Sequence, residues 1–121
     1  MAQTLFQTLG GSGGGALSVT GTRASPIAIT AVGGISFTGT DSRQMWFITG
    51  DASPITVSAN PQIAAASTVG QELILVGRSD TNTLELSDGT GLSLNGSMTF
   101  VENSVLGLVW DGTNFVEMFR R

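Results

Sequence analysis

The segment Ala24-Ser25-Pro26-Ile27-Ala28-Ile29-Thr30 returns 28 residues later as Ala52-Ser53-Pro54-Ile55-Thr56-Val57-Ser58. In both segments, apolar residues alternate with small or polar ones, which is typical of a strand with one buried face. Each proline stands where a strand begins, so its missing N–H removes no hydrogen bond from a sheet. The repeated segment therefore predicts two strands that begin at the same kind of corner.

The repeat extends beyond these two segments. An offset of 28 also aligns Ile35 with Ile63, and Gln44–Ile48 with Glu72–Val76. A weaker third copy needs an offset of 29 and has Val105–Val109 as its last strand. Repeats of this length form units that cannot bury their apolar faces alone, so we expect them to stack on one another. The three expected repeats span residues 24–50, 52–78 and 81–110.

Short strands are expected throughout residues 16–121, separated by turns rich in Gly, Asn, Asp and Ser. Two runs, Met45–Ile48 and Leu73–Val76, are continuously apolar and predict strands buried on both faces. The predicted fold class is all-β, with the repeats forming either a compact β-sandwich or a β-prism or β-helix-like domain.

The C-terminus contains a hairpin signal. Asp111-Gly112 lies between two apolar segments, and this dipeptide is common in tight turns between antiparallel strands. Trp110 and Phe115 flank the turn, so we expect their side chains to pair across it.

Residues 1–15 are set apart from the repeats. Apolar Leu5, Phe6 and Leu9 precede the glycine-rich stretch Gly10–Gly15. Two interpretations are open, because such a stretch is typical of a flexible linker but also allows a docking arm to reach a neighbouring subunit. We take the arm as the working prediction, with these three apolar side chains as its docking residues.

The composition limits the function. Cysteine and histidine are absent, and all five basic residues are arginine. These absences exclude thiol chemistry, zinc sites built on Cys or His, and acid–base catalysis by histidine. Charged residues make up only 12% of the chain, with a net charge of −4 and no basic stripe. We therefore expect no nucleic-acid partner. The longest apolar runs are too short to cross a membrane, so we expect no membrane segment.

Carboxylates are the remaining candidates for catalysis or metal binding. A glycosidase needs two carboxyl groups in one cleft, which spacing in the sequence does not establish. Most of these carboxylates stand in Gly-rich turns, where aspartate caps backbone N–H groups, and no calcium-loop pattern is complete. We therefore expect no enzyme activity, no metal ion and no cofactor. The near pairs considered are Asp41 with Asp51, Asp80 with Asp88, and Asp111 with Glu117.

Two tracts resemble segments of tailed-phage virion proteins. Gly70–Gly96 is similar to a G-x-E-L-x-L-x-G strand followed by an N-T-L-x-L-x-D-G ladder, and Leu108–Arg120 is similar to a terminal L-x-W-D-G hairpin. Such modules occur in capsid decoration (cement) proteins and at the ends of tail fibres, usually as all-β trimers. Phe115 departs from the pattern, which usually carries tryptophan there.

The resemblance implies a small phage structural protein on the capsid exterior. We expect a homotrimer that clamps adjacent major capsid proteins through its N-terminal arm. The alternative is a tail-fibre or tail-tip protein that binds host surface glycans, with Trp110 as a stacking platform; a carbohydrate-degrading spike is a more distant option. The residues expected to pack between subunits are Met45, Trp46, Phe47, Leu73, Leu75 and Trp110.

Overall fold

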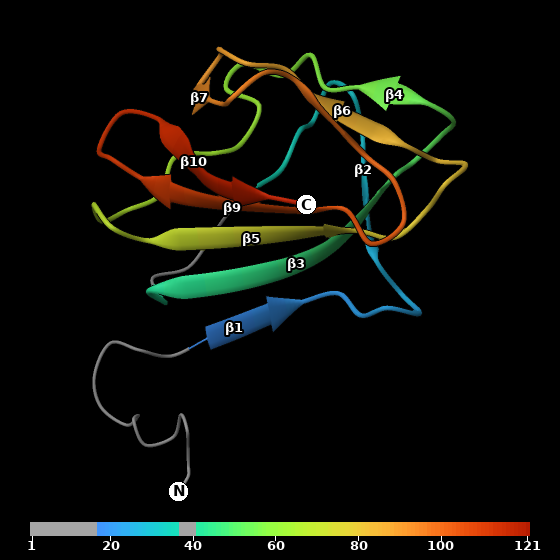
Figure 1. Ribbon diagram of the computed structural model, residues 1–121, viewed down its shortest axis with the longest axis horizontal. Helices are drawn as coiled ribbons and strands as arrows, with labels where there is room; N and C mark the ends of the chain where they lie inside the picture. Colours follow the sequence, from blue (N-terminus) through green and yellow to red (C-terminus); the bar gives the residue numbers. More distant parts are fainter. Residues whose placement is uncertain (1–16, 37–40) are drawn as a thin grey trace, which may run out of the picture.

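The computed structural model describes residues 17–36 and 41–121, in which every regular element is a β-strand (Figure 1). The strands form a β-solenoid of about four turns. The all-β expectation is confirmed, and of the predicted architectures the β-helical stack is the one observed. In chain order the strands are β1 (Leu17–Thr20), β2 (Ile27–Ile29), β3 (Arg43–Gly50), β4 (Ile55–Thr56), β5 (Glu72–Gly77), β6 (Leu84–Leu86), β7 (Leu92–Ser93), β8 (Met98–Phe100), β9 (Val105–Trp110) and β10 (Phe115–Arg120).

The strands belong to two sheets. The large sheet has the order β1-β3-β5-β9-β10-β7, and β2 also pairs with β3; the small sheet has the order β4-β6-β8. Both sheets contribute to one apolar core, which includes Ile48 and Leu75 from the large sheet and Leu84 and Phe100 from the small one. Each of these four side chains is at most 2% exposed.

The first two repeats stack as parallel coils. Ile35 forms a parallel bridge with Ile63, at the predicted offset of 28. The strands β3 and β5 are also parallel, but Gln44 lies opposite Leu73, an offset of 29. The predicted alignment of these two runs therefore differs from the observed register by one residue. Inward and outward side chains alternate along a strand, and only the observed register keeps inward residues beside inward residues.

The third repeat follows this pattern only in part. Its first strand, β6, pairs in parallel with β4, with Ile55 opposite Leu84 at the expected offset of 29. Its last strand does not, because β9 runs antiparallel to β5. In the small sheet, β8 likewise runs antiparallel to β6. Both sheets therefore change from parallel coils to an antiparallel strand at the same end of the stack.

The C-terminal hairpin has the predicted form. β9 and β10 are antiparallel, with Trp110 opposite Phe115, and the two ring centroids are 5.0 Å apart. The Asp111 carboxylate accepts hydrogen bonds from the backbone N–H groups of Thr113 and Asn114 at 2.8 and 2.7 Å. Gly112 has a φ of +102°, which side-chain-bearing residues rarely adopt. The hairpin prediction is confirmed.

Two buried glutamines join successive coils. The Gln62 amide donates to the carbonyls of Ser87 and Gly89, and its oxygen accepts from the Ser87 N–H. The Gln71 amide donates to the Asp41 carbonyl in the preceding coil. A buried amide with satisfied hydrogen bonds stabilises one arrangement of its neighbours, so these contacts hold the coils in register.

Candidate interaction surface

The strands β3 and β5 have two different faces. Their inner side chains lie in the core, whereas their outer side chains are only half-buried. The expectation that both runs are buried on both faces is therefore wrong for the single chain. The inner apolar side chains are Trp46, Ile48, Leu73 and Leu75, and the outer ones are Met45, Phe47, Ile74 and Val76.

One row of outer residues crosses five strands of the large sheet. Pairing places Val19 opposite Met45, Met45 opposite Ile74, Ile74 opposite Gly107, and Gly107 opposite Phe119. Val19 is 53% exposed and Phe119 is 47% exposed. A Cβ atom at Gly107 would overlap the Phe119 ring, so this glycine lets the ring lie against the sheet.

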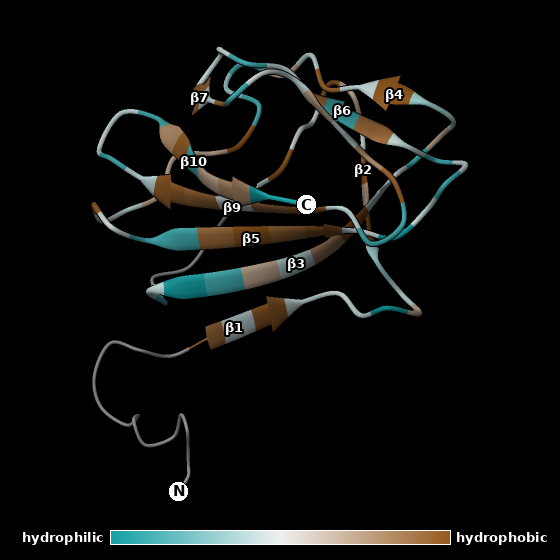
Figure 2. Cartoon of the chain, in the orientation of Figure 1, coloured by the Kyte–Doolittle hydropathy of each residue, from teal (hydrophilic) through white to brown (hydrophobic). Residues whose placement is uncertain are grey.

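A second row runs beside the first. Pairing places Phe47 opposite Val76, and Val76 opposite Val105, and all three side chains are half-buried. Figure 2 shows hydrophobic colouring along much of β5 and β9 and again on β1. We call the following set the outer apolar face: Val19, Met45, Phe47, Ile74, Val76 and Phe119.

Two opposite charges border the outer apolar face. Arg43 begins β3, Glu72 begins β5, and the two residues lie directly opposite each other. In the described part of the chain, neither side chain takes part in a hydrogen bond or an ion pair. The two charges have opposite signs, so this pair adds no net charge beside the outer apolar face.

The strand β1 forms one edge of the large sheet. It pairs in parallel with β3, and no other strand of the described residues pairs with it. An unpaired strand edge presents free N–H and C=O groups to a further strand. Leu17, the first residue of β1, is 46% exposed and directly follows the N-terminal segment. The apolar face and the open edge thus meet where the N-terminal segment joins the sheet.

The residues predicted for subunit packing lie partly in the core and partly on the outer apolar face. Trp46, Leu73 and Leu75 lie in the core of this chain, so their side chains are not available to a neighbour. Met45 and Phe47 belong to the outer apolar face and remain available. Packing between subunits stays a prediction, now limited to outward residues.

Two other predictions concern the ends of the chain. Trp110 is half-buried on the inner side, beside Phe115. The predicted docking residues Leu5, Phe6 and Leu9 lie outside the described residues.

Sequence reasoning missed Ile74 and Val76 as outward residues, although a signal was present. Glu72 is charged and begins the same strand, and side chains two positions apart share a face. Counting in twos from Glu72 therefore assigns both residues to the outer face. The same count from Arg43 assigns Met45 and Phe47 to it.

The candidate catalytic carboxylates are mostly engaged with the backbone. Asp80 accepts a hydrogen bond from the Glu102 N–H at 3.1 Å, and Asp88 accepts one from the Leu94 N–H at 2.9 Å. The N–H groups of the turn lower the pKa of Asp111, with that of Asn114 contributing most. The predicted role in capping a turn is confirmed for Asp111, whereas Asp80 and Asp88 accept N–H groups from residues further along the chain. Among the described residues, no three acidic side chains are grouped closely enough to hold a metal ion.

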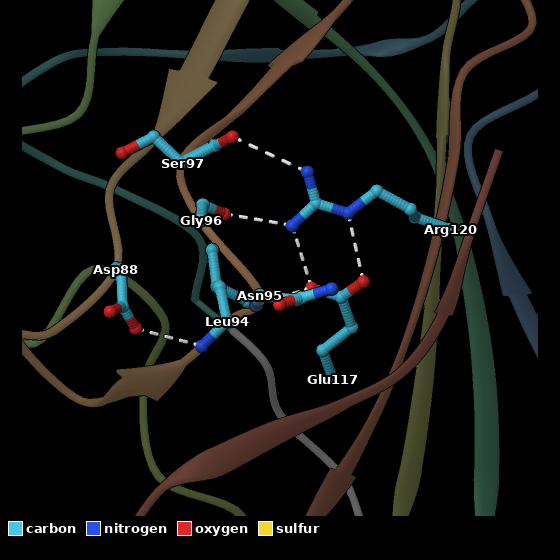
Figure 3. A network of polar contacts seen from close by, with 7 residues as sticks. All are labelled: Asp88, Leu94, Asn95, Gly96, Ser97, Glu117 and Arg120. Carbon is cyan, nitrogen blue, oxygen red and sulfur yellow. Dashed lines mark hydrogen bonds and ion pairs between the residues drawn. The ribbon is translucent and has the colours of Figure 1, made fainter.

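A polar network attaches β10 to the loop before β8 (Figure 3). Glu117 forms an ion pair with Arg120 at 2.7 Å and accepts a hydrogen bond from the Asn95 N–H at 2.8 Å. Arg120 also donates to the carbonyls of Gly96 and Ser97. The hydrogen bond from Arg120 lowers the pKa of Glu117, and the same contact raises the pKa of Arg120. All these bonds are internal, so the network holds the end of the chain in place.

Comparisons with known proteins add no further assignment. No family model, curated protein or solved structure matches this chain. Within residues 17–36 and 41–121, no helix is long and apolar enough to cross a membrane.

Proposed function

We propose that this protein is a structural component of a tailed-phage virion that decorates the capsid exterior. In this role it is a homotrimer that clamps adjacent major capsid proteins and thereby stabilises the shell. The role needs no catalysis, cofactor or metal ion. The resemblance of Gly70–Gly96 and Leu108–Arg120 to virion modules supports the proposal, and these tracts cover β5 to β7 and most of the C-terminal hairpin.

The observation that carries the proposal is the position of β1, which has a strand partner on only one side among the described residues. β1 pairs on one side with β3, and the chain enters β1 directly from the N-terminal segment. The same segment contains Leu5, Phe6 and Leu9, which are suited to insertion into an apolar site on a neighbour. An open edge beside an apolar arm offers a capsid protein both backbone hydrogen bonds and apolar contacts.

The stabilisation follows from mass action. A protein that binds the assembled lattice but not free capsid subunits shifts the equilibrium toward the lattice. At a free concentration one hundred times the dissociation constant, this shift is worth about 2.7 kcal/mol per site. A small protein bound at many sites can therefore strengthen a shell without chemical change.

A truncation of the arm tests the proposal. Deleting residues 1–15 leaves the described strands intact, so the β fold should remain while attachment to capsids weakens. The loss should reach about tenfold or more in affinity per buried apolar side chain, since each contributes roughly 1.5–3 kcal/mol. Binding is measured by saturating capsids that lack the protein and comparing the temperature of genome release.

A variant of unchanged length serves as the control for the truncation. Replacing Leu5, Phe6 and Leu9 together by serine keeps the glycine stretch and removes only the apolar groups. It should bind as weakly as the truncated protein. If both variants saturate capsids like the wild type, the N-terminal segment is a linker and the clamping mechanism is wrong.

The alternative is a tail-fibre or tail-tip protein that binds host glycans. The observation in its favour is Trp110, which is half-buried beside an exposed turn and stacks at a tilt against Phe115. Trp110→Ala separates the two functions. If Trp110 serves packing, its loss should cost about 3 kcal/mol of stability, the lower end for large aromatic truncations.

A glycan platform would give a different result. Trp110→Ala would then remain about as stable as the wild type but lose adsorption to host cells. The copy number in purified virions gives an independent answer. A number comparable with that of the major capsid protein supports decoration, and a small fraction of it supports the tail.

A further inference from the structure

We propose that the outer apolar face packs against the same face of further copies of this chain. The inference rests on the proposed function only in taking the protein to be oligomeric. It adds the surface through which the copies make contact. It depends on no property of the capsid.

The apolar runs of β3 and β5 are covered unequally on their two faces. Continuous apolar runs are typical of strands covered on both faces, yet the described residues bury only the inner side chains of β3 and β5 fully. On the outer face, two apolar rows cross neighbouring strands side by side. A contiguous apolar patch of this kind marks an interaction site in a soluble protein.

The charges beside the outer apolar face indicate which partner covers it. Arg43 and Glu72 lie side by side at one end of the outer apolar face, and neither has a partner among the described residues. A partner of one charge sign would be attracted to one of these residues and repelled by the other. A surface that itself carries one positive and one negative group at matching positions attracts both Arg43 and Glu72. Another copy of this face is such a surface.

A single symmetry axis brings the matching groups of two copies together. A symmetry axis parallel to the strands, between β3 and β5, brings β3 of one copy against β5 of the next. Arg43 then meets Glu72, and Phe47 meets Val76, because these pairs occupy equal positions along their strands. A twofold or a threefold axis gives the same pairs. One arrangement therefore joins apolar with apolar groups and cation with anion.

The mass of the isolated protein in solution tests the proposal. Sedimentation over a range of concentrations should give a multiple of the 12.4 kDa chain mass. Val19→Asp adds a charge to the outer apolar face at a 53% exposed position, where the fold should tolerate it. This variant should raise the dissociation constant at least about tenfold, and Ile74→Asp, closer to the centre, should raise it more.

A matched control adds the same charge elsewhere. Val32 is 82% exposed and does not belong to the outer apolar face, so Val32→Asp should assemble like the wild type. Circular dichroism establishes that each variant keeps its strands. If Ile74→Asp fails to fold, the effect of Val19→Asp on the dissociation constant still tests the proposal.

Charge exchange tests the pairing. Arg43→Glu and Glu72→Arg should each weaken assembly by about tenfold, and the double variant should recover most of the loss. A wild-type protein of 12.4 kDa at every concentration overturns the proposal. An oligomer that is unaffected by Val19→Asp and Ile74→Asp overturns it as well. Capsid binding by a monomeric wild type would contradict this inference and the proposed homotrimer, but would leave the decoration role standing.

Discussion

The two faces of β5 differ although both carry apolar residues within Leu73–Val76. Leu75 is fully buried, whereas its neighbour Val76 is half-buried on the opposite face. The inner residues of β5 belong to the core cluster shared with the small sheet, and the outer residues do not. The difference shows that the apolar content of a strand does not reveal how many of its faces the chain itself covers.

The largest effect is expected from removing side chains on the inner face. Leu75→Ala should lower the free energy of unfolding by about 2–5 kcal/mol, because it leaves a cavity in the core. Val76→Ala, one residue along, should cost about 1 kcal/mol or less in a dilute, dissociated sample. Urea unfolding measures both values. Equal losses would show that the outer face is packed as closely as the inner one and would contradict the difference between the two faces.

The turn of the hairpin determines which residues reach each face. Gly112→Val should destabilise the fold by more than about 1 kcal/mol, because the backbone has a φ of +102° there and a Cβ would lie 3.3 Å from Val69. A shift of one residue in the pairing of β9 with β10 would exchange the two faces of β10. Thermal or urea unfolding measures the loss of stability in the variant. Thr113→Val places the same side chain at the next position and should change stability by no more than about 0.5 kcal/mol.

The smallest effect concerns Glu117, a charged residue opposite the inward Leu108. Its pKa lies below the ordinary value of 4.5 because Arg120 and the Asn95 N–H stabilise the carboxylate. A carboxyl group with a lowered pKa in the folded state stabilises the fold above its unfolded pKa. That contribution disappears as the pH falls through the folded pKa. Stability should therefore decline below about pH 4.5, starting near the unfolded pKa.

Glu117→Gln removes this part of the pH dependence. It should cost about 1 kcal/mol or less at neutral pH, because the contacts are near the surface. The difference from the wild type should shrink in acid, as measured by urea unfolding at several pH values. The pKa of Asp111 is also lowered, so some acid dependence should persist in this variant and decrease further when Asp111→Asn is added. A difference that stays constant with pH would contradict the role of the ion pair.

Several features of the fold could be predicted because they depend on nearby residues. The turn at Asp111-Gly112 needs one aspartate to cap N–H groups and one glycine to adopt a positive φ, and both are adjacent in the sequence. The matched Ala-Ser-Pro segments directly precede β2 and β4, as expected for strand entry. The parallel stacking of the first two coils follows from a repeat that must bury one face against its copy.

The register and the end of the stack could not be predicted in the same way. The offset of β3 and β5 is 29, and not the 28 of the preceding bridge, because the second coil has one more residue in its corner. The inward direction of Trp46 and Leu75 shows that 29 is the correct offset. For the candidate surface, alternation from Arg43 and Glu72 could have assigned the outer residues, but not the fact that the described chain leaves them only half-buried.

The strand content, the turns and the repeating unit could be derived from the sequence alone, since each depends on side-chain alternation and backbone preferences over a few residues. The reversal of β9 beside β5 and the full burial of only one face of β5 by the described residues became known only from the tertiary structure. Both depend on contacts between residues far apart in the chain. An apolar residue has the same tendency to leave water on either face, so which face is buried depends on the element that packs against it.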